Sequence, residues 1–274
     1  MDRQLVYKST HNITPRQKVG TAQNLYLGDA QIRGLGAGVA FTQTAVVQRP
    51  VMLSTMNICS SAPEGDITNI TVAGLSLFTS NQSAALECFA PASFGQRQRV
   101  IGISMSNNQT LVVQGNLTAG GDVAMAAAVD PLTQSEVKQP SDQALGYNYI
   151  FGLGSVAVPA IVGVVPGQAT LNAVATRDCT LGEIILASHT AAIATAGSDI
   201  MVTSILIGGL EQLCGATATQ QIPLQAFFNN ASDANSGLRL SYPIQTNAQV
   251  SITLQNFNAA PITVAGGIFC EPWK

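Results

Sequence analysis

The amino-acid sequence predicts an all-β protein with two tandem jelly-roll or β-sandwich modules related by internal duplication. Three observations support this fold class. Short segments of alternating or β-branched residues recur along the chain, clusters of Gly, Asn and Asp separate them, and two parts of the sequence resemble each other in the same order. The length of 274 residues is sufficient for two domains, each with its own core.

Strands are expected where apolar and polar residues alternate, or where Val, Ile and Thr dominate. The segments between them contain Gly, Asn or Asp, which favour left-handed or Asx-turn backbone. Short helical turns are expected around 81–89 and 211–215, at matching places in the two halves. Many short strands with turns about every eight to twelve residues predict two eight-stranded jelly rolls. The clearest strands are Leu75–Phe78, Thr110–Gln114, Ile200–Ile207, Leu238–Tyr242 and Val250–Gln255.

Three pairs of matching segments carry the internal repeat. The segment 40–58 resembles 169–186, the segment 65–75 resembles 198–210, and the segment 109–131 resembles 250–272. The matched residues are Arg49 and Arg177 (128 apart), Asp66 and Asp199 (133 apart), and Gln114 and Gln255 (141 apart). The spacing grows along the chain, as expected if loops of the second copy contain small insertions. We therefore predict a basic N-terminal arm (1–30), a first jelly roll (31–137), a linker (138–146) and a second jelly roll (147–274).

The longest uncharged stretch, 143–176, is apolar enough to raise the question of a membrane span. Several Gly and Pro residues interrupt it, and Val dominates its composition. These features disfavour a membrane helix. We instead expect this stretch to lead from the linker into the first buried strands of the second module.

Charged residues make up only 10% of the chain, whereas they make up about a quarter of a typical soluble domain. Few charges mean little repulsion between copies, which suits a subunit that buries much of its surface against neighbours. The first 50 residues contain six basic and two acidic side chains, a net charge of +4, and the remainder has a net charge of −7. A basic arm on an acidic body indicates contact with nucleic acid, lipid headgroups or an acidic face of another subunit; the alternative is an ordinary solvated terminus.

The five cysteines show no CxxC pair and no zinc-binding spacing. Their odd number and their scatter argue against a disulfide framework, so buried free thiols in a reducing compartment are expected. The first residues contain no apolar segment of the secretory type, which predicts a protein that is not secreted. The cysteines are Cys59, Cys88, Cys179, Cys214 and Cys270.

The sequence lacks a recognisable catalytic or metal-binding constellation. Its two histidines, His11 and His189, cannot supply the clustered ligands of a cupin-type metal site, and no GxSxG elbow accompanies them. The glycine run 34–38 lacks the spacing of a dinucleotide-binding loop. Asp66 and Asp199 recur in both copies, which suits acids that cap turns better than the acid pair of a glycosidase. We therefore predict no catalytic residue, no cofactor, no metal and no enzyme activity.

Two tandem jelly rolls, no catalytic constellation, few charges and a basic arm together resemble the double-jelly-roll major capsid proteins of icosahedral, often membrane-containing, phages and viruses. The resemblance covers the whole chain and rests on architecture and internal duplication, with no signature motif. It implies that both barrels stand upright to the capsid surface and that three subunits form a pseudo-hexagonal capsomer. Two similar barrels in one subunit would give such a homotrimer approximate sixfold symmetry, so that a few contact types tile a closed surface.

The resemblance also implies a location and partners. The N-terminal arm would lie under the shell, with Arg3, Lys8, Arg16 and Lys18 facing the viral genome or the lipid of an internal membrane. The protein would be part of the virion and assemble in the host cytoplasm. Its partners would be further copies in the capsid lattice, minor capsid proteins, and the genome or membrane beneath the arm.

Two other functions stay open. A receptor- or carbohydrate-binding β-sandwich protein of a virion spike or tail predicts ligand loops lined with aromatic residues, but aromatic residues make up 5% of the chain and Trp273 is the single Trp. An enzyme on a β-sandwich scaffold predicts a constellation of acids and histidine, which the sequence does not display.

Overall fold

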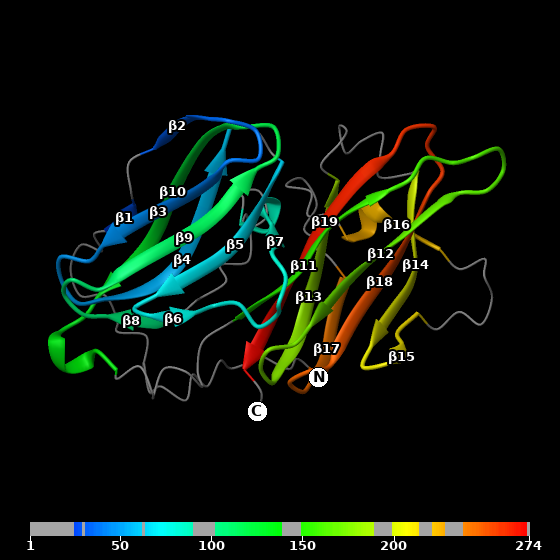
Figure 1. The fold of residues 1–274 in the computed structure, drawn as a ribbon. Coiled ribbons are helices and arrows are strands. Elements are labelled where there is room, and N and C mark those ends of the chain that lie inside the picture. The colour runs from blue at the N-terminus through cyan, green and yellow to red at the C-terminus, as the bar shows by residue number, and fades with distance from the viewer. Residues whose placement is uncertain are drawn as a thin grey trace.

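The computed structural model describes residues 25–28, 31–61, 64–89, 102–138, 149–188, 199–213, 221–227 and 238–272. These residues form two β-sandwiches side by side, the first up to Lys138 and the second from Tyr149 (Figure 1). A short 3-10 helix, η2 (Gln134–Glu136), follows the last strand of the first module. The predicted all-β class is confirmed.

The first module consists of two antiparallel sheets. One sheet has the order β1-β10-β4-β8, with β2 also pairing with β10, and the other has the order β3-β9-β5-β6, with β7 also pairing with β5. The first sheet contains β1 (Leu25–Gly28), β2 (Ile32–Leu35), β4 (Val51–Ser60), β8 (Ile103–Met105) and β10 (Gly121–Pro131). The second contains β3 (Ala40–Val46), β5 (Gly65–Val72), β6 (Leu75–Ser76), β7 (Ala84–Ala85) and β9 (Thr110–Leu117), and β7 leads into η1 (Leu86–Phe89).

The second module repeats this arrangement. Its sheets have the orders β11-β19-β13-β17 and β12-β18-β14-β15, with β16 also pairing with β14. The first sheet contains β11 (Tyr149–Val158), β13 (Cys179–Ser188), β17 (Leu238–Ile244) and β19 (Ile262–Pro272). The second contains β12 (Gly167–Val174), β14 (Ile200–Ile207), β15 (Leu210–Glu211), β16 (Ile222–Pro223) and β18 (Gln249–Asn256), and β16 leads into η3 (Leu224–Phe227).

The strand orders identify both modules as jelly rolls. If the eight strand positions are lettered B to I along the chain, both modules have one sheet of order B-I-D-G and one of order C-H-E-F, in which early and late strands of the chain lie side by side. The B position is held by β1 and β2 in the first module and by β11 in the second. Because β1 pairs with β10 through Leu25 and Val129, the first sheet begins inside the segment that the sequence predicted as an arm (1–30).

Side-chain alternation explains why these segments form sandwiches. In β3 every second residue, beginning with Phe41, is buried, and β9 and β18 follow the same period of two. The inward residues of both modules belong to one continuous apolar cluster. Burial of this cluster is the main favourable term in folding, since a chain with few charges and few aromatic residues relies on its Val, Ile and Leu side chains.

The two modules share their irregularities as well as their strand order. In the D strands, Ser54 is skipped in the pairing of β4 with β10, and Gly182 is skipped at the matching place in the pairing of β13 with β19. In the E strands, Thr68 is skipped in β5, and Thr203 is skipped at the matching place in β14. A β-bulge bends its strand and fixes the register, so two bulges at matching places make the match of the modules specific.

Turns with left-handed backbone match in the same way. Ala73 and Gly74 have φ values of 51° and 85°, and Gly208 and Gly209 have 57° and 83°, as in the type I′ turn of a tight hairpin. Asn108 and Asn247, which lie just before β9 and β18, have φ values of 65° and 70°.

We call two residues equivalent when they hold the same place in this shared pairing. The sequence positions of two equivalent residues differ by 124 in the B strands, 128 in C and D, 135 in E, 139 in G and H, and 141 in I. The difference grows along the chain, as the sequence analysis expected from insertions in the second copy.

The structural register corrects the sequence alignment in the E and H strands by two residues. The Thr118 amide donates to the Glu64 carbonyl (2.9 Å) and the Phe257 amide to the Asp199 carbonyl (2.8 Å), so Asp199 is equivalent to Glu64 and not to Asp66. By the same register Gln114 is equivalent to Thr253. A slip of two leaves every side chain on the same face of its strand, so alternation in the sequence could not detect it.

The 3-10 helices are also equivalent in place. The helical turn expected around 81–89 is present as η1. The prediction of a helical turn beginning at Glu211 is wrong, because Glu211 lies in strand β15. The corresponding helix of the second module is η3. Strand β15 pairs with β14 directly after the glycine turn, which leaves no room for a helix there.

Candidate assembly surface

The four arm residues predicted to contact genome or lipid, Arg3, Lys8, Arg16 and Lys18, lie outside the described residues, and so do both histidines. Their roles stay predictions. The part of the predicted linker beyond Lys138 is also outside the described ranges.

Two of the described carboxylates, those of Asp178 and Glu211, accept hydrogen bonds from backbone amides near turns. Asp178 accepts hydrogen bonds from the Thr246 amide (2.7 Å) and hydroxyl (2.8 Å), and these bonds lower the pKa of its carboxyl. Burial acts to raise the pKa of Glu211, but hydrogen bonds from Ser204 and from the amides of Ile205 (2.9 Å) and Leu213 (3.1 Å) outweigh it and lower that pKa. Glu211 therefore has partners close to it in the chain, whereas Asp178 is bonded to Thr246 in a distant part of the sequence.

No group of three or more His, Cys, Asp or Glu side chains within the described ranges could hold a metal ion. Among the same residues, no helix has the length and apolar character needed to cross a membrane. Cys88, Cys179 and Cys270 are buried free thiols as expected, whereas Cys59 points outward from β4 and is exposed.

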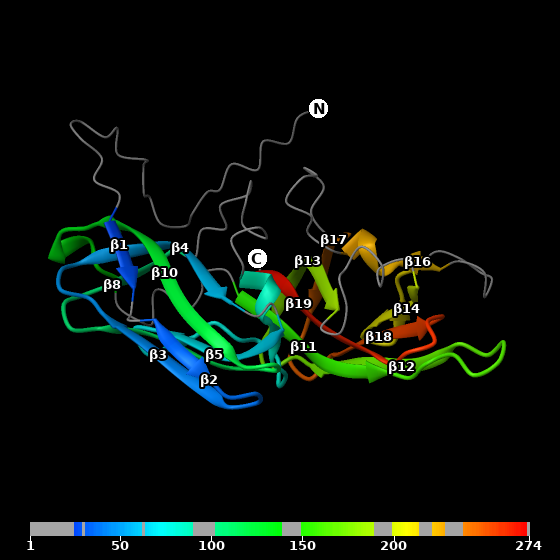
Figure 2. The ribbon, with the colours of Figure 1, turned by 90° about the horizontal axis from the view of Figure 1, so that it is seen from above.

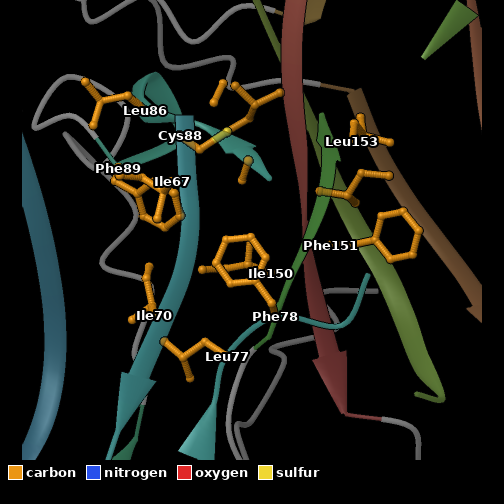
Figure 3. Close-up of a cluster of buried hydrophobic side chains, with 14 of the residues drawn as sticks. Ile67, Ile70, Leu77, Phe78, Leu86, Cys88, Phe89, Ile150, Phe151 and Leu153 are labelled. Atoms are coloured by element: carbon orange, nitrogen blue, oxygen red, sulfur yellow. The ribbon is translucent and has the colours of Figure 1, made fainter. Parts of the chain in front are cut away.

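A set of backbone hydrogen bonds forms a junction between the two modules. We call residues Leu77–Ser83 the bridging segment. The Leu77 amide donates to the Ile70 carbonyl of β5 (2.9 Å), and the Leu77 carbonyl accepts from the Ile150 amide of β11 (2.8 Å). Phe78 forms a parallel bridge with Ile150. The bridging segment therefore continues the C-H-E-F sheet of the first module into the B-I-D-G sheet of the second (Figures 1 and 3).

Further backbone hydrogen bonds tie the bridging segment to the second module. They join the Thr79 amide to the Ile150 carbonyl (2.8 Å), the Thr176 amide to the Thr79 carbonyl (2.7 Å), the Asn81 amide to the Val174 carbonyl (3.2 Å) and the Gly154 amide to the Ser83 carbonyl (2.8 Å). The Asn81 side chain also accepts from the Val174 amide (2.9 Å), and the Ser80 hydroxyl donates to the Gly152 carbonyl (2.8 Å). Thr79 is fully buried, so these bonds form in a dry interface where an unpaired polar group is costly.

Burial on both faces of β11 reflects this junction. Six successive residues, Tyr149–Gly154, are buried, whereas a strand covered on one face would alternate. A Cβ atom on Gly152 would lie 2.2 Å from the Gln82 carbonyl oxygen, so the close approach of the bridging segment requires glycine there. Figure 3 shows Leu77 and Phe78 packed beside Ile150.

The η1 helix adds a second contact with the sheet of the second module. The Phe89 and Phe269 rings meet edge to face, with centroids 6.4 Å apart and an interplanar angle of 69°. A Cβ atom on Gly267 would lie 3.1 Å from the Cys88 sulfur, so β19 packs closely under η1. The sequence analysis missed this junction, although glycines within a strand-like run, at 152, 154, 266 and 267, signal close backbone approach.

The outward faces of the C and H strands are uncharged throughout both modules. The exposed residues there are mostly Thr, Gln, Asn and Ser, as in Thr42 and Thr44 of β3 or Gln168 and Asn172 of β12. The four strands β3, β9, β12 and β18 contain no Asp, Glu, Lys or Arg. Depletion of charge distinguishes the centres of protein–protein interfaces from the rest of a surface.

Seven large apolar side chains are exposed within the described residues. They are Val39, Val46, Val162, Val164, Val165, Leu210 and Phe257. Three of them lie in the stretch 143–176, which the sequence predicted to lead from the linker into the first buried strands of the second module. Strands β11 and β12 do occupy much of it, but Val162–Val165 forms the exposed turn between them, with Val164 93% exposed and Gly163 at a φ of 63°. The turn forms because Gly163 accepts the left-handed backbone that a tight hairpin needs.

Comparison with known proteins gives matches in structure alone. No protein-family model matches the chain, and no curated protein matches it in sequence. Among solved structures, the chain is similar to PBCV-1 VP54, whose crystal structure was fitted into a cryo-EM reconstruction of the virophage Sputnik, with 7% identity, coverage of 93% of this chain and 96% of the other, and a TM-score of 0.35. It is also similar to the major capsid protein P2 of bacteriophage PM2, with 8% identity, coverage of 92% and 98%, and a TM-score of 0.32.

Cleavage of the predicted linker tests whether the junction alone holds the modules together. With a protease site inserted within 138–146, the cut chain should remain one particle in native gel filtration, because the hydrogen bonds of the bridging segment do not depend on the linker. The two fragments should separate in denaturant. Fragments that elute apart under native conditions would contradict a stable junction.

Substitution of Gly152 tests the close approach at β11. Gly152→Val should lower the free energy of unfolding by about 3 kcal/mol or more, because its side chain would collide with the backbone of the bridging segment. Ala157→Val, at an exposed position of the same strand, should change it by less than about 0.5 kcal/mol. Urea unfolding measures both, and equal stability of the two variants would refute the contact.

Proposed function

We propose that this chain is a virion structural protein, the major capsid subunit that forms homotrimeric, pseudo-hexagonal capsomers of an icosahedral shell. The proposal rests on the chain's own geometry: two jelly rolls with the same strand order, the same bulges and the same turns are fused into one body. Internal duplication of one ancestral jelly roll accounts for this match.

The observation that carries the proposal is the way in which the two jelly rolls meet. The F edge of the first module, continued by the bridging segment, contacts the B strand of the second. This is a head-to-tail contact between like units, and among the described residues it leaves one B edge and one F edge of each copy outside the junction. Head-to-tail contacts form a ring when the rotation closes, and three copies would place six jelly rolls in such a ring.

The surface chemistry supports a subunit that is covered by neighbours. A monomer surface with charge-free C and H strands has little repulsion to keep copies apart. Amide and hydroxyl groups can exchange water for hydrogen bonds with a neighbouring copy, at lower desolvation cost than Lys or Glu. Asp178 and Glu211, whose carboxylates accept hydrogen bonds from backbone amides, favour a structural role for these two acids.

The proposal assigns the N-terminal arm to the inner face of the shell. Its basic residues Arg3, Lys8, Arg16 and Lys18 would contact the genome or an internal membrane by attraction to phosphate groups. Minor capsid proteins would complete the lattice, and assembly would take place in the host cytoplasm.

A recognition role is the second candidate, and one observation favours it. The exposed turn with Val164 lies at the same end of the second module as Phe257, because the Ile161 amide donates to the Asn258 carbonyl (3.0 Å). Exposed apolar loops at one end of a sandwich suit the receptor- or carbohydrate-binding protein of a spike or tail.

The mass of the purified protein in solution tests the proposed function. Light scattering should give closed shells, or trimers with three times the chain mass of 28.4 kDa. Negative-stain images of the same fractions should show hexagon-like particles or shells. A stable monomer that binds glycans would contradict the capsid role and favour the recognition role.

Removal of the arm separates its role from that of the jelly rolls. A chain without residues 1–20 should form the same trimers as the full chain, because the strands begin at Leu25. It should fail in shell assembly or in binding to nucleic acid or anionic vesicles, since it loses its basic residues. If the trimers fall apart instead, the arm is a clamp between subunits and its proposed place under the shell is wrong.

A further inference from the structure

We propose that the junction within the chain is repeated between chains: the module-2 edge 210–213 docks against β1 and the end of β3 in a second copy. This inference rests on the proposed self-assembly and names its contact residues. It follows from the places that the equivalents of the junction residues hold in the other module.

The docking edge of the first module has a matching edge in the second. Leu75, which directly precedes the bridging segment, is equivalent to Leu210, and Leu77 is equivalent to Gln212. The Gln212 amide donates to the Ile205 carbonyl (2.8 Å), just as the Leu77 amide donates to the Ile70 carbonyl. The backbone of the two edges therefore follows the same path up to this point.

The two edges differ in what covers them. Leu75 is half-buried and packs against the continuous apolar cluster. Leu210, at the equivalent place, is 61% exposed. The second module thus presents the same type of edge, but the described residues leave most of its leading leucine exposed.

The surface that contacts the bridging segment is covered in the second module, and its equivalent in the first module is exposed. Val174, at the end of β12, exchanges hydrogen bonds with Asn81 of the bridging segment through its amide and its carbonyl. Its equivalent in the first module is Val46, at the end of β3, which is 43% exposed. Val46 pairs with Thr110 in the same way as Val174 pairs with Gln249. The amide and carbonyl of Val46 therefore face the outer edge of β3, as those of Val174 face the bridging segment.

A glycine completes the match on the B strand. Gly152 lies opposite Gly267 in the pairing of β11 with β19, and Gly28 lies opposite Ala126 in the pairing of β1 with β10. Gly28 and Gly152 are therefore equivalent. Gly152 is required by the close approach of the bridging segment, and the equivalent position of β1 in the first module is also a glycine.

Charge does not oppose this contact. Strand β3 is uncharged, and the acid nearest Leu210 is Glu211, whose carboxylate accepts hydrogen bonds from its own turn. An interface here would thus bury no unpaired charge among these residues.

The two surfaces cannot meet within one molecule. Strands β15 and β16 lie at one end of the molecule, and β1 and β3 lie at the opposite end, with the junction between them (Figures 1 and 2). They can therefore meet only between copies, in a head-to-tail contact of the same kind as the internal junction.

Two single variants test the contact from its two sides. Val46→Asp and Leu210→Asp place a charge on one surface each, and Val39→Asp, at a 48% exposed valine outside the contact, is the control. Thermal unfolding should show that all three variants fold. In sedimentation, Val46→Asp and Leu210→Asp should each have the mass of a monomer, 28.4 kDa, while Val39→Asp should assemble as the wild type does.

An equal mixture of Val46→Asp and Leu210→Asp provides the sharpest outcome. Each variant retains the surface that the other has lost, so the mixture should form a dimer, with twice the chain mass of 28.4 kDa, that grows no further. If the wild type assembles but the variants assemble equally well, or the mixture stays monomeric, this inference is wrong and the capsid role stands. If the wild type itself is a monomer, the proposed function fails first.

Discussion

The bridging segment is the constraint on which the rest of the structure depends. Thr79 is fully buried, and its amide and carbonyl both bond to the second module, to Ile150 and Thr176. Each such bond contributes about 1 kcal/mol net, but a buried group left without its partner costs more, about 1–3 kcal/mol. Separation of the modules would break several bonds at once and expose the apolar side chains beside them. Two sandwiches that could each be a domain are thereby held as one body.

The shared register shows how one architecture serves two positions in a larger assembly. The strand orders, the bulges of the D and E strands and the left-handed turns after E and before H are the same in both modules, while the edges differ in what covers them. The space beside Gly152 and Val174 is occupied by the bridging segment, whereas Val46, at the place equivalent to Val174, is exposed. The turn between β11 and β12 is longer than its counterpart, because the difference in number between equivalent residues rises from 124 to 128 there, and the added length carries Val164 into solvent.

The sequence is informative about the fold because strand period and turn chemistry are local properties. Alternation, as in Val250–Gln255, the turn clusters of Gly, Asn and Asp, and the internal repeat predicted two jelly rolls. Register was predicted less well, since a slip of two residues between Asp66 and Asp199 keeps the alternation intact. The junction depends on which strands meet across a long stretch of sequence, as Thr79 and Ile150 do. In the sequence, the polar residues after Phe78 resemble a turn. Their hydrogen-bond partners lie in the second module, far away in the sequence.

Amide hydrogen exchange at Ile150, Gly154 and Thr176 is the most direct measurement of the central claim, that a strand-like segment of the first module is part of the second module's sheet. The acceptors of these three amides are Leu77, Ser83 and Thr79. The account predicts exchange as slow as that of the core amides of β19, with loss of protection in the same cooperative unit. Fast exchange at all three amides, with β19 still protected, would show that the modules merely touch and would contradict it.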